Sequence, residues 1–236
     1  MSKSAPGSKD VARILKKEVF PLLQGAGFRE FTTRTAWKTS QDVIAVVNFR
    51  SLGSYLGSRV GFTSHSFVVT VGLYYKAMHA VPWAKDPVPG HPEEWQCQAR
   101  RVLKKSIFQF WHWRPDVWYV DSKAANLDGV IRDVRRTIEQ QAIPWLEEFS
   151  DLRRALKAFE SRKGSQMLPG IACEILGGRL GSFARAEAAS ALALACGEKE
   201  RAKKAWHKVL ANPYYRRLTH MREQAEERIV LIDRQK

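Results

Sequence analysis

Residues 66–75, with the sequence SFVVTVGLYY, decide the class of fold that this chain adopts. Every second side chain from Phe67 to Tyr75 is apolar, and a second set of side chains alternates with them. Because successive side chains of a strand point to opposite faces of a sheet, this period of two predicts a β-strand. The fold is therefore expected to contain a sheet, and the rest of the chain is assigned around this strand.

Two further strand-like runs precede this stretch. Residues 28–38 are rich in Thr, Phe and Trp, and residues 43–50 (VIAVVNFR) are almost entirely apolar. The polar residues 39–42 (TSQD) between them favour a hairpin turn. Residues 51–64 are rich in Gly and Ser and indicate a long loop before the third strand.

A helix is expected before the strands, because apolar residues recur at helical spacing between Val11 and Leu22. Asp10 is the expected N-cap. Pro21 is expected to kink the helix, and Gly25 or Gly27 to end it.

The chain after the third strand is less regular. Residues 76–95 contain four prolines and exclude regular helix or a central strand. A short helix is then expected from Pro92 to about Lys105, followed by strands at residues 107–113 and 117–120. Ser122 is expected to cap a long helix that ends near Phe149.

The last third of the chain is expected to be helical. Leu152, Leu156 and Phe159 have helical spacing, and residues 161–170 form the best linker candidate. Three helices are predicted after the linker, over residues 184–196, 198–210 and 214–232.

Together these elements predict an α+β fold. An antiparallel sheet of about four to five strands is packed by helices, and an α-helical C-terminal part follows. The expected organisation is a flexible tail at residues 1–9, an α+β domain at residues 10–163 and a helical extension at residues 170–236.

The composition is that of a globular protein with an excess of positive charge. Of its 236 residues 44% are hydrophobic, and the formal net charge is +15. Residues 1–80 carry eleven Lys and Arg against four Asp and Glu, and residues 166–236 carry thirteen against eight. Such a field attracts nucleic acid, an anionic membrane or an acidic protein, although solubility alone also accounts for it.

The three cysteines are widely separated and include no CxxC pair, which favours reduced thiols and a cytoplasmic location over a disulfide framework. The N-terminus has no apolar segment typical of a signal peptide. No uncharged apolar stretch of about 18 residues occurs, so membrane insertion is not expected.

The usual signatures of catalysis are missing. The six His residues show no metal-ligand spacing, no glycine-rich loop carries a phosphate-binding signature, and no GxSxG motif occurs. We therefore predict no metal, no cofactor and no catalytic residue. The sequence leaves an enzyme open as a third option but favours a protein without enzymatic activity.

The most unusual segment is residues 98–121, where cations and aromatic residues are dense. On the predicted short helix the cations lie four residues apart, so a bound anion would relieve their repulsion. Aromatic rings beside cations suit stacked bases or a protein hot spot; alternatively, the rings are the core of the sheet. The candidate binding residues are Arg100, Arg101, Lys104, Lys105, Trp111, Trp113, Arg114 and Trp118.

Several short motifs occur in a distinctive order: Phe20-Pro21-Leu22-Leu23, Gly27-Phe28, Val46-Val47-Asn48-Phe49 and the strand from Phe67 to Leu73. With the segments Arg100-Arg101 and Asp116-Val117-Trp118, this order resembles a bacterial family catalogued as domain of unknown function 4304. The resemblance covers roughly residues 10–160. It implies a helix packed on an antiparallel sheet, and it brings no known activity, substrate or catalytic residue.

Two functions follow from these observations. The first is a non-enzymatic binding protein that presents a basic, Trp/Arg-rich surface to an acidic protein partner. The alternative is a nucleic-acid-binding protein that uses the same surface. Both depend on whether residues 98–121 are exposed.

Overall fold

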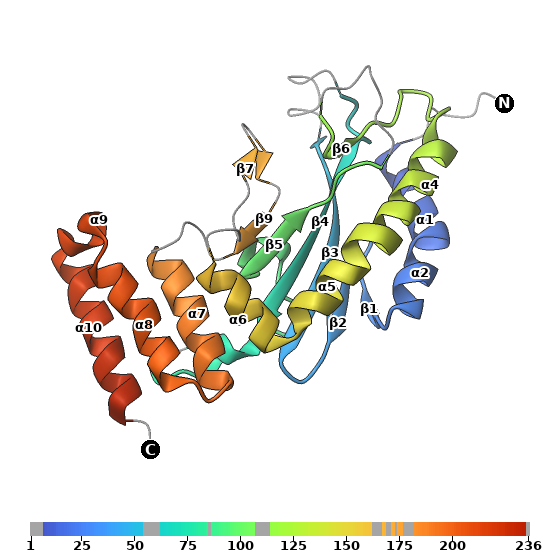
Figure 1. Cartoon of the computed structure of the whole chain (residues 1–236). Coiled ribbons are helices and arrows are strands. Elements are labelled where there is room, and N and C mark those ends of the chain that lie inside the picture. The colour runs from blue at the N-terminus through green and yellow to red at the C-terminus, as the bar shows by residue number, and fades with distance from the viewer. Residues whose placement is uncertain are drawn as a thin grey trace. The chain divides into compact units, whose positions relative to one another are not determined.

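The computed structural model describes residues 7–53, 62–84, 86–106, 114–161, 167–168, 171–172, 174–176 and 182–234 (Figure 1). The chain divides into two compact units. Unit 1 comprises Met1–Thr39, Ala45–Gly72 and Arg101–Leu146, and unit 2 comprises Ser40–Ile44, Leu73–Arg100 and Glu147–Lys236.

The predicted α+β class is confirmed. The main sheet has the strand order β1-β2-β3-β4-β5-β9, and β6 also pairs with β4. The pairs β1–β2 and β4–β6 are antiparallel, with Glu30 opposite Trp37 and Phe67 opposite Trp118. The strands are β1 (Glu30–Phe31), β2 (Thr35–Thr39), β3 (Val43–Ser51), β4 (Phe67–Tyr75), β5 (Ala99–Val102), β6 (Val117–Trp118) and β9 (Glu174–Leu176).

The stretch at residues 66–75 forms strand β4 as predicted, and all of its residues from Phe67 to Tyr75 are buried. The run predicted at residues 28–38 forms two strands instead of one, because the chain turns between Phe31 and Thr35. In that turn Thr32 Oγ1 accepts hydrogen bonds from the backbone of Arg34 and Thr35. Residues 40–42 form the expected hairpin turn, closed by the Ser40 side chain.

The N-terminal helix of unit 1 is divided in two. Helix α1 (Ser8–Glu18) ends before Val19, and α2 (Phe20–Gly25) starts with Pro21 in its first turn, where a missing N–H costs least. The predicted N-cap, Asp10, is wrong. Gly7 is the N-cap, and the Asp10 carboxylate accepts from the Gly7 backbone N–H at 2.9 Å.

Unit 1 is held together by a chain of aromatic rings. Phe20 of α2 contacts Phe49 of β3 with ring centroids 6.2 Å apart, and Phe49 contacts Phe67 at 6.5 Å. Phe67 stacks on Trp118 of β6 at 6.1 Å. These tilted, edge-on and stacked pairs contribute roughly 0.5–1.5 kcal/mol each beyond the apolar area that they bury.

The long helix predicted from Ser122 starts later, with α4 (Leu127–Thr137). The Asp121 carboxylate accepts hydrogen bonds from the backbone of Lys123, Ala125 and Asn126, which holds residues 121–126 in a non-helical loop. A π-helical turn, η3 (Ile138–Ala142), then leads into α5 (Ile143–Ser150). The wider turn lies where Pro144 would clash with an α-helical carbonyl.

The helix predicted at residues 92–105 is wrong. This segment forms a short 3-10 turn, η2 (Glu94–Gln96), and then strand β5. In unit 2 Gln98 Oε1 accepts from the Tyr75 backbone N–H at 2.8 Å, and in unit 1 the Leu103 N–H donates to the Val69 carbonyl at 2.9 Å. The segment thus makes its hydrogen bonds with β4, and this tertiary pairing overrides the local helical spacing.

Unit 2 is mainly helical. Helices α6 (Leu152–Glu160), α7 (Phe183–Ala195), α8 (Lys199–Leu210) and α10 (Thr219–Arg234) pack in chain order, α6 on α7, α7 on α8 and α8 on α10 (Figure 1). The 3-10 helix η1 (Lys76–His79) packs on α7. The predicted helices are confirmed, except that the last is split into α9 (Pro213–Arg216) and α10.

The expectation that everything after the linker is helical is wrong. Short strands β7 (Met167–Leu168) and β8 (Ile171–Ala172) pair with each other, and β9 joins the main sheet. Most of the predicted linker, residues 162–166 and 169–170, lies outside the described residues. The strands have only two or three residues each, which is too short for a period of two to stand out in the sequence.

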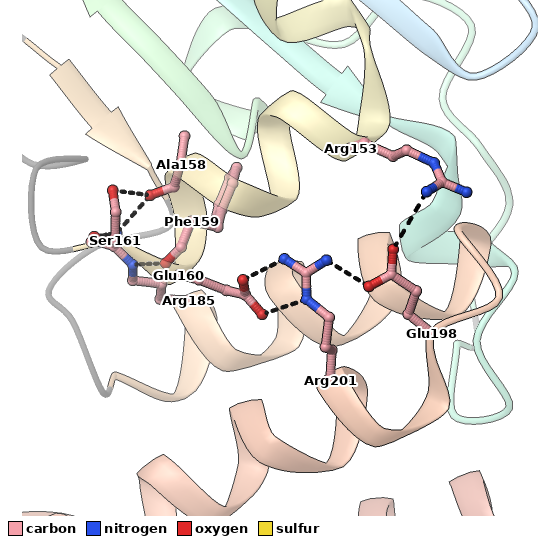
Figure 2. Close-up of polar contacts among 8 residues, drawn as sticks. All are labelled: Arg153, Ala158, Phe159, Glu160, Ser161, Arg185, Glu198 and Arg201. Atoms are coloured by element: carbon pink, nitrogen blue, oxygen red, sulfur yellow. Dashed lines mark hydrogen bonds and ion pairs between the residues drawn. The ribbon is translucent and has the colours of Figure 1, made fainter.

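A buried arginine links two of the helices in unit 2. Arg185 of α7 is 2% exposed, and its Nε donates to the Phe159 carbonyl at 2.6 Å. Its Nη2 donates to the carbonyls of Ala158 and Ser161, at 3.2 and 2.7 Å. Figure 2 shows these bonds at the C-terminus of α6. A cation at this end satisfies unpaired carbonyls and opposes the helix dipole.

An ion network lies beside it. Arg201 of α8 binds both oxygens of Glu160, at 3.1 and 2.5 Å, and also the Glu198 carboxylate at 2.5 Å (Figure 2). Arg153 of α6 approaches the same Glu198 at 3.8 Å. These contacts raise the pKa of the Arg201 guanidinium, mainly through the hydrogen bonds to Glu160 and Glu198. The network therefore joins α6 to α8.

Candidate binding surface

The structure turns three of the eight predicted binding residues inward. Trp118 is 1% exposed, and its Nε1 donates to Asp133 Oδ2 of α4 at 2.9 Å. Its ring therefore belongs to the core of unit 1 and offers no stacking surface. The sequence allowed either exposed rings that bind a partner or rings in the core of the sheet, and Trp118 belongs to the second group.

Arg114 and Lys105 both interact with the buried Asp116 carboxylate. Arg114 binds Asp116 through Nε and Nη2, at 2.8 and 2.6 Å, and Asp116 is 3% exposed. The Lys105 Nζ is buried without a hydrogen-bond partner, and burial lowers the pKa of its amine against the attraction of Asp133 and Asp116. Asp133 also accepts from the backbone N–H and the hydroxyl of Ser106. This polar cluster ties Ser106 to α4 and Arg114 to Asp116.

The other predicted residues are half-buried or lie outside the described part. Arg100 and Arg101 are adjacent in strand β5, so their side chains point to opposite faces, and Lys104 follows the strand. All three are partly buried. Trp111 and Trp113 lie outside the described residues. The predicted anion site required cations four residues apart on one face of a helix. Because this segment forms a strand, that arrangement does not exist.

The positive charge is concentrated in unit 1. Its chain ranges contain 18 Lys and Arg against eight Asp and Glu, whereas unit 2 contains 21 against 16. Unit 1 thus carries +10 of the net charge of +15, with fewer residues than unit 2.

Two packed helices of unit 1 display much of this charge. Helix α1 packs against α4, and Arg135 lies 3.8 Å from the Glu18 carboxylate across their contact. On each helix the exposed cations recur three or four residues apart, opposite the buried apolar side chains. We call this surface the α1–α4 basic face; its cations are Lys9, Arg13, Lys16, Lys17, Arg132, Arg135 and Arg136, all exposed.

Some cations of the α1–α4 basic face form ion pairs with acidic residues, and others do not. Arg13 pairs with Asp10 at 3.3 Å and Lys17 with Glu18 at 3.3 Å. Asp128 and Glu139 are exposed on or next to α4. Among the residues that the structure describes, four cations of the face make no ion pair: Lys9, Lys16, Arg132 and Arg136.

The described residues show neither a metal site nor a membrane span. No group of three or more His, Cys, Asp and Glu side chains in this part of the chain is placed to hold a metal ion. Likewise, no described helix has the length and apolarity needed to cross a bilayer. Cys97 is a buried free thiol, and burial raises its pKa far above the usual value, which does not favour a nucleophile.

Residues 19–148 match a family described as Domain of unknown function (DUF4304). The chain belongs to this family. The match covers more than half of the chain and includes β1 to β6 and α4, which confirms the resemblance inferred from the short motifs. No curated protein and no solved structure matches the chain.

The DUF4304 match contains the α4 half of the basic face, while all of α1 and all of α6 to α10 lie outside it. Sequence reasoning missed the α1–α4 basic face as a unit. The helical pattern did place Arg13, Lys16 and Lys17 opposite the apolar stripe, but their proximity to α4, more than 100 residues later, is a tertiary contact.

Proposed function

We propose that this member of the DUF4304 family is a non-enzymatic binding protein that presents the α1–α4 basic face to an acidic protein partner. The observation that carries the proposal is the packing of α1 on α4, which gathers exposed cations from two distant segments into one field. Cations that lack an internal partner lose no contact when they meet an external carboxylate. The surplus of +10 on unit 1 would also steer an acidic partner toward it.

The mixed charge of the face favours a protein over a nucleic acid. Asp10, Glu18, Asp128 and Glu139 lie among its cations, and a continuous row of phosphates would meet these carboxylates at repulsive distances. A protein partner can place its own cations opposite them. Moreover, the large exposed hydrophobic side chains among the described residues (Val88, Trp95, Tyr214 and Val230) all belong to unit 2, so no described aromatic ring of unit 1 belongs to this exposed set, which would suit base stacking.

The test compares two double charge reversals with equal net charge. Lys16→Glu with Arg136→Glu reverses one unpaired cation on each helix of the basic face. Arg216→Glu with Arg217→Glu reverses two exposed cations at the end of α9 in unit 2. Each tagged protein is used to recover partners from an extract of its own host at moderate salt, with and without nuclease, and the recovered proteins are identified and then titrated in purified form.

We expect the wild type and the α9 variant to recover the same acidic protein after nuclease treatment. The basic-face variant should bind it at least about tenfold more weakly, mainly through slower association. Equal binding by all three proteins would overturn the role of the face. Recovery that disappears with nuclease, together with a steep salt dependence on purified DNA or RNA, would assign the face to nucleic acid instead.

A further inference from the structure

Unit 2 contains a cavity of about 320 Å³ whose residues play no part in the proposed function. Its walls come from the end of β4, from η1 and the residues that follow it, and from helices α7 and α10. The volume lies at the lower end of the range for small-molecule sites. The cavity is lined by Tyr74, Met78, His79, Trp83, Ala84, Asp86, Gln98, Glu187 and Arg228.

Two buried N–H groups of the lining lack an acceptor. The Nε of Arg228 and the Nε1 of Trp83 are both buried without a hydrogen-bond partner, and the Arg228 guanidinium lies over the Trp83 ring, 4.9 Å from its centre. The Trp83 indole is close enough to the Glu187 carboxyl to favour its charged form, but the two lack the geometry of a hydrogen bond. Buried donors without an acceptor are rare in folded proteins, so a bound group that accepts from these two donors is expected.

Two carboxyl groups line the same cavity. Glu187 is half-buried on α7, and burial raises the pKa of its carboxyl, against the opposing effects of Arg228 and Trp83. Asp86 lies on the segment after η1. A dianion such as phosphate would therefore meet two acidic groups as well as the arginine, which disfavours it.

The remaining polar groups of the wall already have partners. His79 Nδ1 lies 2.5 Å from the Asp86 carbonyl, which accepts only, so Nδ1 carries the proton. In the neutral ring Nε2 is then the acceptor, and the Tyr74 hydroxyl donates to it at 2.5 Å. The two rings also stack, with centroids 5.7 Å apart. Gln98 Oε1 is occupied by the Tyr75 N–H. These contacts occupy His79, Tyr74 and the Gln98 oxygen, and they leave Arg228, Trp83, Glu187 and Asp86 for a ligand.

We infer that the cavity binds a small zwitterion with one carboxylate and one protonated amine, such as a free amino acid. The carboxylate accepts from Arg228 Nε–H and Trp83 Nε1–H, and the ammonium group faces Glu187 and Asp86. This arrangement supplies the missing acceptor to both donors and a cation to both carboxyl groups. A carboxylate that accepts from an arginine and an indole forms charge-assisted bonds, which are the stronger class of hydrogen bond.

The test uses the full-length protein and calorimetric titration with the twenty amino acids, with their monocarboxylate analogues that lack the amine, and with inorganic phosphate. Trp83→Phe keeps an aromatic ring under Arg228 and removes the indole N–H. Glu187→Gln keeps the shape of the side chain and removes its charge. The matched controls are Trp95→Phe, at an exposed Trp of the 3-10 turn η2, and Glu148→Gln, at an exposed Glu of α5.

We expect one or a few amino acids to bind, with Trp83→Phe weakening them about tenfold or more and both controls leaving them unchanged. Glu187→Gln should lower the affinity for the amino acid while leaving or raising that for its monocarboxylate analogue. A purely structural role for Glu187 would not produce this change in preference. No binding by any amino acid, or equal binding by Trp83→Phe and Trp95→Phe, would overturn the inference. So would a preference for phosphate.

Discussion

Two groups of cations, one in each unit of this protein, are used in opposite ways. In unit 1 the cations of α1 and α4 are exposed, and four of them make no ion pair among the described residues. In unit 2 the arginines Arg185, Arg201 and Arg228 are drawn into the structure, where they bind carbonyls, carboxylates or an indole ring. The net charge of unit 2 is half that of unit 1, although it has more basic residues.

This difference shows that the number of basic residues is a poor guide to a binding surface. An arginine at the C-terminus of a buried helix stabilises the fold, because it satisfies carbonyls that would otherwise lack a partner. An arginine on the outer face of a solvated helix adds little to stability and contributes to the external field.

Arg185→Leu should destabilise unit 2 most. The change leaves the carbonyls of Ala158, Phe159 and Ser161 without their donor in a buried site, at an expected cost of about 3 kcal/mol or more. Urea unfolding followed by circular dichroism measures it. Arg132→Leu on the exposed face of α4 is the matched control and should change the unfolding free energy by less than about 0.5 kcal/mol. Equal effects of the two substitutions would contradict the division between the units.

Trp118→Phe should destabilise unit 1 by about 2 kcal/mol. The ring still packs on Phe67, but Asp133 loses the indole donor and its carboxylate remains buried. Thermal unfolding measures the change, and Trp95→Phe at an exposed tryptophan is the control. If Trp118→Phe left stability intact and impaired partner binding, Trp118 would be a surface residue after all.

Arg201→Ala should cost about 1 kcal/mol. Its network with Glu160 and Glu198 is only partly exposed, but solvent screens such pairs and much of their attraction is lost. The cost should fall as salt is raised from low to about 0.5 M, because ions screen exposed pairs. Arg222→Ala breaks a single pair with Glu226 at 3.8 Å and serves as the control, with a cost near zero. A cost for Arg201→Ala that ignored salt would mean that packing, and not the network, carries it.

The fold was largely predictable from the sequence, and the candidate sites were not. The apolar period of two at residues 66–75 identified β4, and apolar residues at helical spacing identified α1 and α6, because burial imposes these periods directly. The segment around Arg100 failed, because its charges have helical spacing while its hydrogen bonds are satisfied by β4. Neither the α1–α4 basic face nor the cavity at Arg228 has a local signature, since each is assembled from segments more than 100 residues apart.

The most direct test of the different use of cations is a pair of matched double substitutions. Arg132→Gln with Arg136→Gln neutralises two cations of the α1–α4 basic face, and Arg185→Gln with Arg201→Gln neutralises two of unit 2. For both we would measure the free energy of unfolding and the affinity for an acidic partner in the same buffer. We expect the first variant to keep its stability within about 0.5 kcal/mol and to lose affinity, whereas the second should lose about 3 kcal/mol or more of unfolding free energy. The reverse pattern, or equal loss of stability in both, would contradict it.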